Sequence, residues 1–154
     1  MRIAVGSDHA GFSMKGHIIE MLKAEGHSVL DLGSHNTDPA DYPDYAQAVG
    51  ETVMHGEAEV GILLCGSGVG ASIAANKIRG IRAALCHDTF SARQSREDDD
   101  ANVLCLGPRV IGPKLAEELV HAFLAARFSG AERHRRRLAK VLELERRPNI
   151  DEKT

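Results

Sequence analysis

The sequence contains no tryptophan, and only 4% of its 154 residues are aromatic. This scarcity disfavours a nucleic-acid surface built on base stacking. No charge of one sign dominates either, because 19 lysines and arginines accompany 22 aspartates and glutamates, for a net charge of −3. Such a balance disfavours a general nucleic-acid binder. No apolar run approaches the roughly 20 residues that cross a bilayer, so we expect no membrane span.

Cysteine is scarce as well, with only Cys65, Cys86 and Cys105. An odd number without CxxC spacing disfavours a disulfide framework or a cysteine-rich zinc site. The N-terminal segment is typical of a strand rather than a secretory signal. We therefore expect a cytoplasmic protein with reduced thiols. The length suits a single domain over residues 1–147, followed by a polar tail over residues 148–154.

Short apolar runs alternate with amphipathic stretches along the chain. The pattern predicts strands at residues 3–5, 28–32, 60–64, 82–86 and 102–106. It predicts helices at residues 12–25, 43–55, 69–77, 89–97, 113–128 and 132–147. Alternating strands and helices indicate an α/β fold, a three-layer αβα sandwich with a Rossmann-like five-stranded parallel sheet. Ligands bind such sheets at the carboxyl ends of the strands, where we expect the functional site.

Two of these strand ends carry residues suited to chemistry. The first strand ends in Asp8 and His9, which could bind sugar hydroxyls or a phosphate; alternatively, Asp8 caps the next helix and His9 is a surface residue. The third strand ends in Cys65-Gly66-Ser67-Gly68-Val69-Gly70. Glycines between a strand and a helix let backbone N–H groups approach an anion, although the loop is neither a Walker A loop nor a GxGxxG fingerprint. Cys65 could supply a thiolate there or be a small buried residue.

A basic run, Arg133 to Arg137, lies on the last predicted helix. Arg133 and Arg137 are four residues apart, share a helix face and could clamp one phosphate, with Arg109 as a further cation. The other interpretation is a solvated, charged face. The acidic run at residues 97–100 is a poor candidate metal site, because consecutive residues of one turn point in different directions. We expect neither a metal nor a cofactor.

Together, these residues resemble ribose-5-phosphate isomerase B, within the wider group that includes galactose-6-phosphate isomerase. The resemblance covers nearly the whole chain and is carried by motifs that are specific only in combination. They are Gly6-Ser7-Asp8-His9-Ala10-Gly11, Asp41-Tyr42-Pro43, Cys65-Gly66-Ser67-Gly68-Val69-Gly70, Ile73-Ala74-Ala75-Asn76-Lys77, Asn102-Val103-Leu104, Gly107-Pro108-Arg109 and Arg133-His134 with Arg137.

The resemblance implies metal-free interconversion of an aldose phosphate and a ketose phosphate through a cis-enediolate. Cys65 would be the general base, and the amides of residues 66–70 with Ser67 would hold the developing oxyanion. The substrate-binding residues implied are Asp8, His9, Tyr42, Gly66, Ser67, Gly68, Val69, Gly70, Asp99, Arg109, Arg133 and Arg137. The resemblance also implies a homodimer or homotetramer whose sites are shared between subunits.

One position departs from the family's pattern. Where the family usually has the histidine thought to open the sugar ring, this sequence has Asp98, followed by Asp99. Asp98 could accept a proton from the anomeric hydroxyl, but an ionised carboxylate is a poor proton donor. The change is compatible with an acyclic tetrose 4-phosphate as substrate. It is also compatible with slower ribose isomerisation, with His87 or water acting instead, or with a sequence altered at this position.

Three functions follow from this sequence. The first is the isomerisation of D-ribose 5-phosphate and D-ribulose 5-phosphate, with Cys65, Ser67 and Asp98 as catalytic residues. A variant within the same class acts on erythrose/erythrulose 4-phosphate or galactose 6-phosphate instead. A function of another class is a non-catalytic phosphosugar-binding partner subunit, against which the retained Cys65 argues. A nucleotide-binding module is disfavoured by the absence of both glycine fingerprints.

Overall fold

We describe residues 1–148 of the protein from a computed structural model. Within these residues the chain forms, in order, β1 (Arg2–Ser7), η1 (His9–Gly11), α1 (Phe12–Ala24), β2 (Ser28–Asp31), α2 (Tyr42–Met54), β3 (Val60–Leu64), α3 (Val69–Ala75), β4 (Ala83–Leu85), α4 (Thr89–Asp99), β5 (Val103–Leu106), α5 (Pro113–Ala125) and α6 (Glu132–Arg146). Every predicted strand and helix is present, with ends displaced by at most three residues. The predicted polar tail lies outside the described residues, apart from Pro148.

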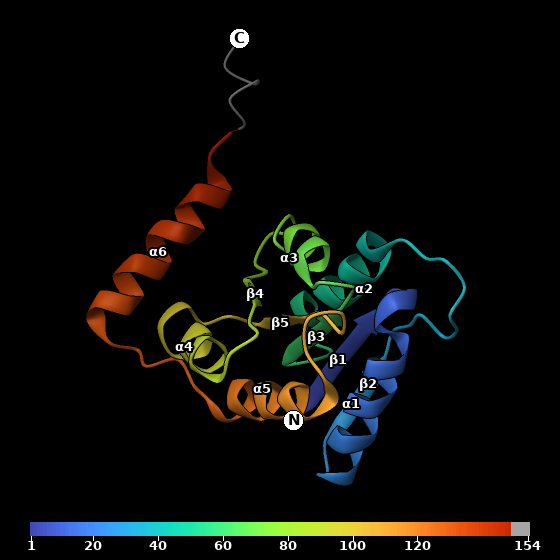
Figure 1. The fold of residues 1–154 in the computed structure, drawn as a ribbon. Coiled ribbons are helices and arrows are strands. Elements are labelled where there is room, and N and C mark those ends of the chain that lie inside the picture. Colours follow the sequence, from blue (N-terminus) through green and yellow to red (C-terminus); the bar gives the residue numbers. More distant parts are fainter. Residues whose placement is uncertain (149–154) are drawn as a thin grey trace.

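The five strands form one parallel sheet in the order β2-β1-β3-β5-β4 (Figure 1). β3 is the central strand, and all five of its residues are buried, as expected for a strand covered on both faces. Parallel neighbours cannot be joined by a tight hairpin, so helices connect them. The predicted three-layer αβα sandwich is therefore confirmed.

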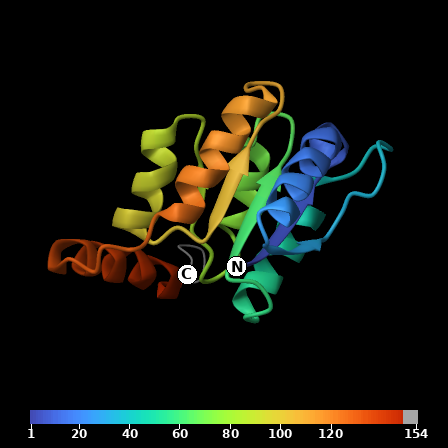
Figure 2. The same cartoon turned by 90° about the horizontal axis from the view of Figure 1, so that it is seen from below.

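Side chains alternate between the two faces of the sheet and form two separate apolar cores. The face that carries Ile62 and Leu104 packs against α1, α4 and α5, with Phe123 of α5 fully buried among them. The face that carries Leu63 and Val103 packs against α2 and α3. Figure 2 shows α1 and α5 side by side over one face of the sheet. The sheet is thus fixed from both sides, and the loops at its edges are held in place.

The end of α5 comes three residues earlier than the sequence predicts. Ala126 has extended backbone angles, φ −82° and ψ 154°. The Nη1 of Arg127 donates hydrogen bonds to the carbonyl oxygens of Leu124 (2.7 Å) and Ala126 (2.8 Å). A side chain therefore satisfies carbonyls that have no partner at a helix end, and the chain leaves the helix there.

Helix α6 lies outside the three layers, next to α4 (Figures 1 and 2). Just before α6 begins, the N–H of Ser129 donates to the carbonyl oxygen of Glu97 (2.9 Å). In the last turn of α6, the Glu145 carboxylate accepts a hydrogen bond from the N–H of Gly80 (3.2 Å). The helix is thus attached near both of its ends. No helix within residues 1–148 is both long enough and apolar enough to cross a bilayer.

Candidate active site

Three loops meet at the carboxyl edge of the sheet, because the last residues of β1, β3 and β5 are in register. Asp8, Cys65 and Gly107 follow these strands directly. The N–H of Asp8 donates to the carbonyl oxygen of Leu64 (3.2 Å), and that of Cys65 donates to Leu106 (3.3 Å). Backbone hydrogen bonds therefore continue beyond the strands and hold the loops side by side.

The Cys65 side chain is only 4% exposed and belongs to the core between the sheet, α2 and α3. The next residues form a tight loop: Gly68 has φ +79°, and a Cβ at this position would lie 2.9 Å from the carbonyl carbon of Leu106. The Ser67 hydroxyl accepts a hydrogen bond from the N–H of Val69 (3.3 Å). Cys65 is therefore a small buried residue, and it also lies directly next to a constrained loop of backbone amides.

Asp8 and His9 both make defined hydrogen bonds. Asp8 Oδ1 accepts from the N–H groups of Ala10 (3.0 Å) and Gly11 (3.2 Å), so the capping alternative is confirmed. His9 Nδ1 accepts from the N–H of Ala40 (3.1 Å), which leaves Nε2 to carry the proton of a neutral ring. Both residues line a cavity of about 440 Å³, together with residues 40–44. Nε2 of His9 is thus available as a donor to a ligand.

Tyr42 and Arg109 lie against the glycine loop. A Cβ on Gly70 would lie 2.7 Å from Cζ of Tyr42, and a Cβ on Gly66 would lie 2.9 Å from Nη1 of Arg109. Only glycine allows either side chain to approach the loop this closely. Tyr42 also lines the cavity of Asp8 and His9, so the structure brings the carboxyl-edge candidates together.

The structure places the other candidates elsewhere. Helix α4 begins after β4 and runs back across the sheet, so its last turn, with Asp98, lies at the amino edge, opposite Cys65. Asp98 Oδ1 lies 3.4 Å from Nε2 of His134, at the start of α6. Arg133 and Arg137 are exposed on that helix. Within one chain, therefore, Asp98 and these arginines are not brought to Cys65.

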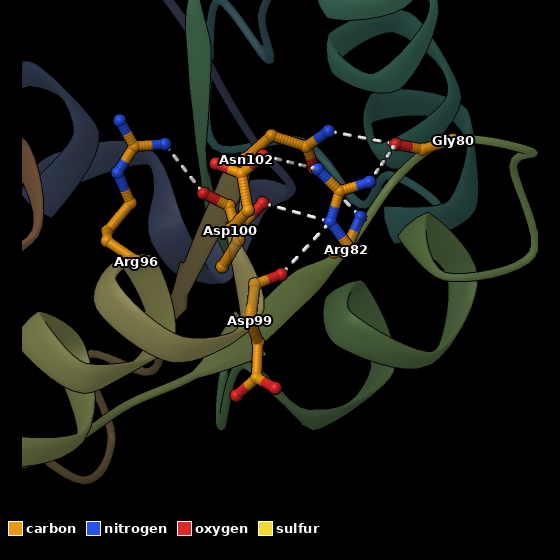
Figure 3. Close-up of polar contacts among 7 residues, drawn as sticks. Gly80, Arg82, Arg96, Asp99, Asp100 and Asn102 are labelled. Carbon is orange, nitrogen blue, oxygen red and sulfur yellow. Dashed lines mark hydrogen bonds and ion pairs between the residues drawn. The ribbon is translucent and has the colours of Figure 1, made fainter. Parts of the chain in front are cut away.

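Asp99 follows Asp98 at a turn that is fixed by Arg82 (Figure 3). The Nε of Arg82 donates to the carbonyl oxygens of Asp99 (3.1 Å) and Asp100 (2.9 Å), and its Nη2 lies 3.3 Å from Oδ2 of Asp100. Asn102 Nδ2 donates to the carbonyl oxygen of Gly80 (2.9 Å). The exposed Asp99 carboxylate points away from this network in Figure 3. Its backbone is fixed while its side chain is available to a ligand.

Two histidines named in the sequence analysis make contacts that only the structure reveals. His134 is 7% exposed and lies between Asp98 and the hydroxyl of Ser129 (2.6 Å from Nδ1). His87 Nε2 accepts a hydrogen bond from the N–H of Gly107 (3.0 Å). Partial burial lowers the pKa of His87 below its ordinary value. The sequence gives no signal for the contact of His134 with Asp98 or for that of His87 with Gly107, because each joins segments that are far apart in the chain.

Comparison with known proteins identifies the family. The sequence profile described as Ribose/Galactose Isomerase matches residues 3–141. The chain is 45% identical to ribose-5-phosphate isomerase B of Escherichia coli, over 96% of this chain and 99% of that one. It is 44% identical to D-erythrulose-4-phosphate isomerase of Pectobacterium atrosepticum, over 84% and 86%.

A solved structure agrees in fold as well as in sequence. Ribose-5-phosphate isomerase B of Clostridium thermocellum superposes with a TM-score of 0.93 at 48% identity, covering 95% of this chain and 98% of that one. The resemblance noted in the motifs is thus confirmed along the whole fold. The chain belongs to the Ribose/Galactose Isomerase family of aldose–ketose isomerases.

Proposed function

We propose that this protein interconverts D-ribose 5-phosphate and D-ribulose 5-phosphate, with Cys65 as the general base. The observation that carries the proposal is the position of Cys65: it directly precedes a loop of backbone amides, and Arg109 and the Asp8–His9 cavity lie on either side of that loop. The similarity to ribose-5-phosphate isomerase B of E. coli supports the same assignment.

In the proposed reaction, the Cys65 thiolate removes the proton from C2 of the open-chain aldose. The C–H electron pair forms the C1–C2 double bond, and the C1 carbonyl oxygen becomes the negative oxygen of a cis-enediolate. Backbone N–H groups of residues 66–70 and the Ser67 hydroxyl stabilise that charge where it develops. Transfer of the C2 hydroxyl proton to the C1 oxygen, together with return of the carbon-bound proton from Cys65 to C1, gives the ketose. The chemistry calls for neither a metal nor a cofactor.

The sugar and its phosphate are held by the remaining candidates. His9 donates from Nε2, Asp8 accepts hydroxyl protons, and Tyr42 lines the cavity. Arg109, next to Gly66, is the phosphate-binding cation on the same chain. A guanidinium binds two phosphate oxygens at once, which fixes the reacting carbons relative to Cys65.

We infer that the phosphate-binding Arg133 and Arg137 are supplied by a second copy of the chain. They lie with Asp98 and Asp99 at the edge opposite Cys65, so a complete site combines the two edges of two subunits. A groove of about 550 Å³ between α6 and the β4 region offers an interface, with Val141 45% exposed and Leu144 61% exposed. A homodimer is the smallest such assembly, and a homotetramer would contain two.

A tetrose 4-phosphate is the second candidate substrate. A four-carbon sugar phosphorylated at O4 cannot close a furanose ring and needs no ring-opening group. Asp98 lies against His134 in place of the family's usual histidine, and one relative is D-erythrulose-4-phosphate isomerase. Galactose 6-phosphate is a further alternative within this class.

We further infer that residues 1–147 form a single isomerase domain.

A panel of aldose phosphates with four, five and six carbons tests these assignments, with the matching ketose followed directly. We expect the highest kcat/KM for ribose 5-phosphate or, if the alternative holds, for erythrose 4-phosphate. Cys65→Ala should lower kcat by about 10²–10⁴-fold. Cys105→Ala, a change at a fully buried thiol within β5, is the matched control and should retain turnover.

Two results would contradict the proposal. Full turnover by a folded Cys65→Ala variant would remove Cys65 as the base. No turnover by the purified wild-type oligomer on any sugar, combined with saturable phosphosugar binding, would favour the non-catalytic partner subunit.

A further inference from the structure

His87 lies on a fourth loop at the carboxyl edge, directly after Cys86 and the short edge strand β4. The ring is partly buried, and its Nε2 accepts the backbone N–H of Gly107 at 3.0 Å. An N–H group can donate only to an unprotonated ring nitrogen. The proton of the neutral ring is therefore on Nδ1, and this contact exists only while His87 is neutral.

Gly107 packs directly on the loop that follows Cys65. A Cβ on Gly107 would lie 2.3 Å from the carbonyl carbon of Ser67 and 2.5 Å from its Cα, so the two backbones are in contact without a side chain between them. Two residues further on, the N–H of Arg109 donates to the carbonyl oxygen of Gly66 (3.0 Å). A shift of Gly107 would therefore move both Ser67 and Arg109.

We propose that neutral His87 is a positioning residue that holds Gly107, and through it Ser67 and Arg109, in the geometry that binds the oxyanion and the phosphate. The proposal rests on the proposed function of the Cys65 loop. His87 itself touches no reacting atom. Protonation at Nε2 would turn two N–H groups toward each other and release Gly107 from the ring.

The charge state of His87 supports this role. Burial lowers the pKa of His87 below its ordinary value and so favours the neutral ring. The two neighbours along the chain do not offset this effect of burial: the Asp88 carboxylate is ionised but caps α4 through the N–H of Ser91 (2.7 Å), and burial raises the pKa of Cys86 to about 11, which keeps its thiol neutral.

Three variants test the proposal on the full-length oligomer with its best sugar phosphate. His87→Gln places Oε1 near the position of Nε2 and keeps an acceptor that does not titrate. His87→Ala removes the acceptor. His17→Gln, at an exposed position of α1, is the matched control. Since the substrate phosphate titrates in the same range, each variant is compared with wild type at the same pH.

At pH 8 we expect His87→Gln to stay within about twofold of wild type and His87→Ala to lose roughly three- to tenfold in kcat/KM, the loss typical of one hydrogen bond. Titration of the ring in the folded protein first locates the pKa of His87. From pH 8 down to one pH unit below that pKa, the ratio of wild-type to His87→Gln kcat/KM should fall at least about threefold. The His17→Gln ratio should stay constant. A constant ratio for His87→Gln, or a His87→Ala variant as active as wild type at pH 8, would overturn the proposal.

A second measurement is independent of turnover. In ¹H–¹⁵N spectra, the Gly107 amide resonance should follow the protonation of His87 in wild type and should lose that transition in His87→Gln. If the Gly107 resonance does not respond to the titration, His87 does not hold Gly107, regardless of the activity that is measured. If Gly107 responds but no sugar phosphate is turned over, the contact stands and the proposed function fails.

Discussion

Oδ1 of Asp98 and Nε2 of His134 lie 3.4 Å apart and join α4 to α6 next to the helix face that carries Arg133 and Arg137. The other oxygen of Asp98 accepts a hydrogen bond from Nε2 of Gln94 (2.9 Å). His134 in turn bonds to Ser129 through Nδ1 (2.6 Å). Both carboxylate oxygens are thus engaged, one with α6 and the other within α4, which is the physical reason to question Asp98 as the group that opens a sugar ring.

Replacing Asp98 with histidine tests this point. We expect Asp98→His to raise kcat/KM for ribose 5-phosphate by about tenfold or more, because an imidazole can transfer the protons that ring opening requires. For erythrose 4-phosphate, which forms no furanose, kcat/KM should not rise. The measurement is a pair of initial-rate series at neutral pH.

The control for this prediction is Asp98→Asn, which removes the charge but supplies no titrating group. Asp98→Asn should not raise kcat/KM for either sugar. An equal gain for both sugars in Asp98→His would show that the effect has nothing to do with ring opening.

The proposed sharing of sites between subunits predicts complementation between two inactive proteins. Cys65→Ala and the double variant Arg133→Ala/Arg137→Ala should each be nearly inactive alone. After unfolding and refolding as an equal mixture, half of the dimers are mixed, and each mixed dimer has one intact site. Activity should therefore recover to about a quarter of the wild-type value. If the arginines served their own chain's Cys65, mixing would restore nothing.

The ion pair between Lys15 and Asp31 predicts a pH-dependent stability. Lys15 is 2% exposed, and its Nζ lies 2.6 Å from Oδ1 of Asp31. Burial by itself would raise the pKa of Asp31, but hydrogen bonds from Lys15 and the N–H of Gly33, with the Lys15 charge, hold it below its ordinary value. The stabilisation is therefore present above the unfolded-state pKa of about 3.9 and is lost as the pH falls through the lower, folded-state pKa.

Asp31→Asn should accordingly lower the free energy of unfolding by about 2 kcal/mol at pH 7. This is less than the 3–5 kcal/mol typical of a fully buried pair, because the Asp31 side chain is 39% exposed. Urea denaturation at constant protein concentration should show the difference shrinking toward pH 3. Asp38→Asn, in an exposed loop, is the control and should show little effect. A difference that does not change with pH would contradict the assignment.

Two glycines predict opposite effects of the same substitution. Gly107→Ala places a methyl group within 2.5 Å of the Ser67 backbone, so we expect a loss of roughly 1–3 kcal/mol in stability together with reduced turnover. Gly16→Ala, in α1 with no atom within 4 Å of the new Cβ, should stabilise the protein by about 0.5–1 kcal/mol. Thermal unfolding and initial rates check both. If Gly107→Ala left both the stability and the turnover unchanged, the two loops would not be in tight contact.

The sequence by itself determined the elements of the fold, because the period of the apolar residues depends only on local backbone geometry. It also predicted that Asp8 and Cys65 would meet, since carboxyl ends of parallel strands share one edge. It could not place Arg137 or the partner of Asp98. Only the tertiary structure decided that α6 stands outside the layers and that Asp98 pairs with His134 there. The sequence also could not predict the contact between His87 and Gly107, because that hydrogen bond joins segments whose distance apart is set by the packing of the whole sheet.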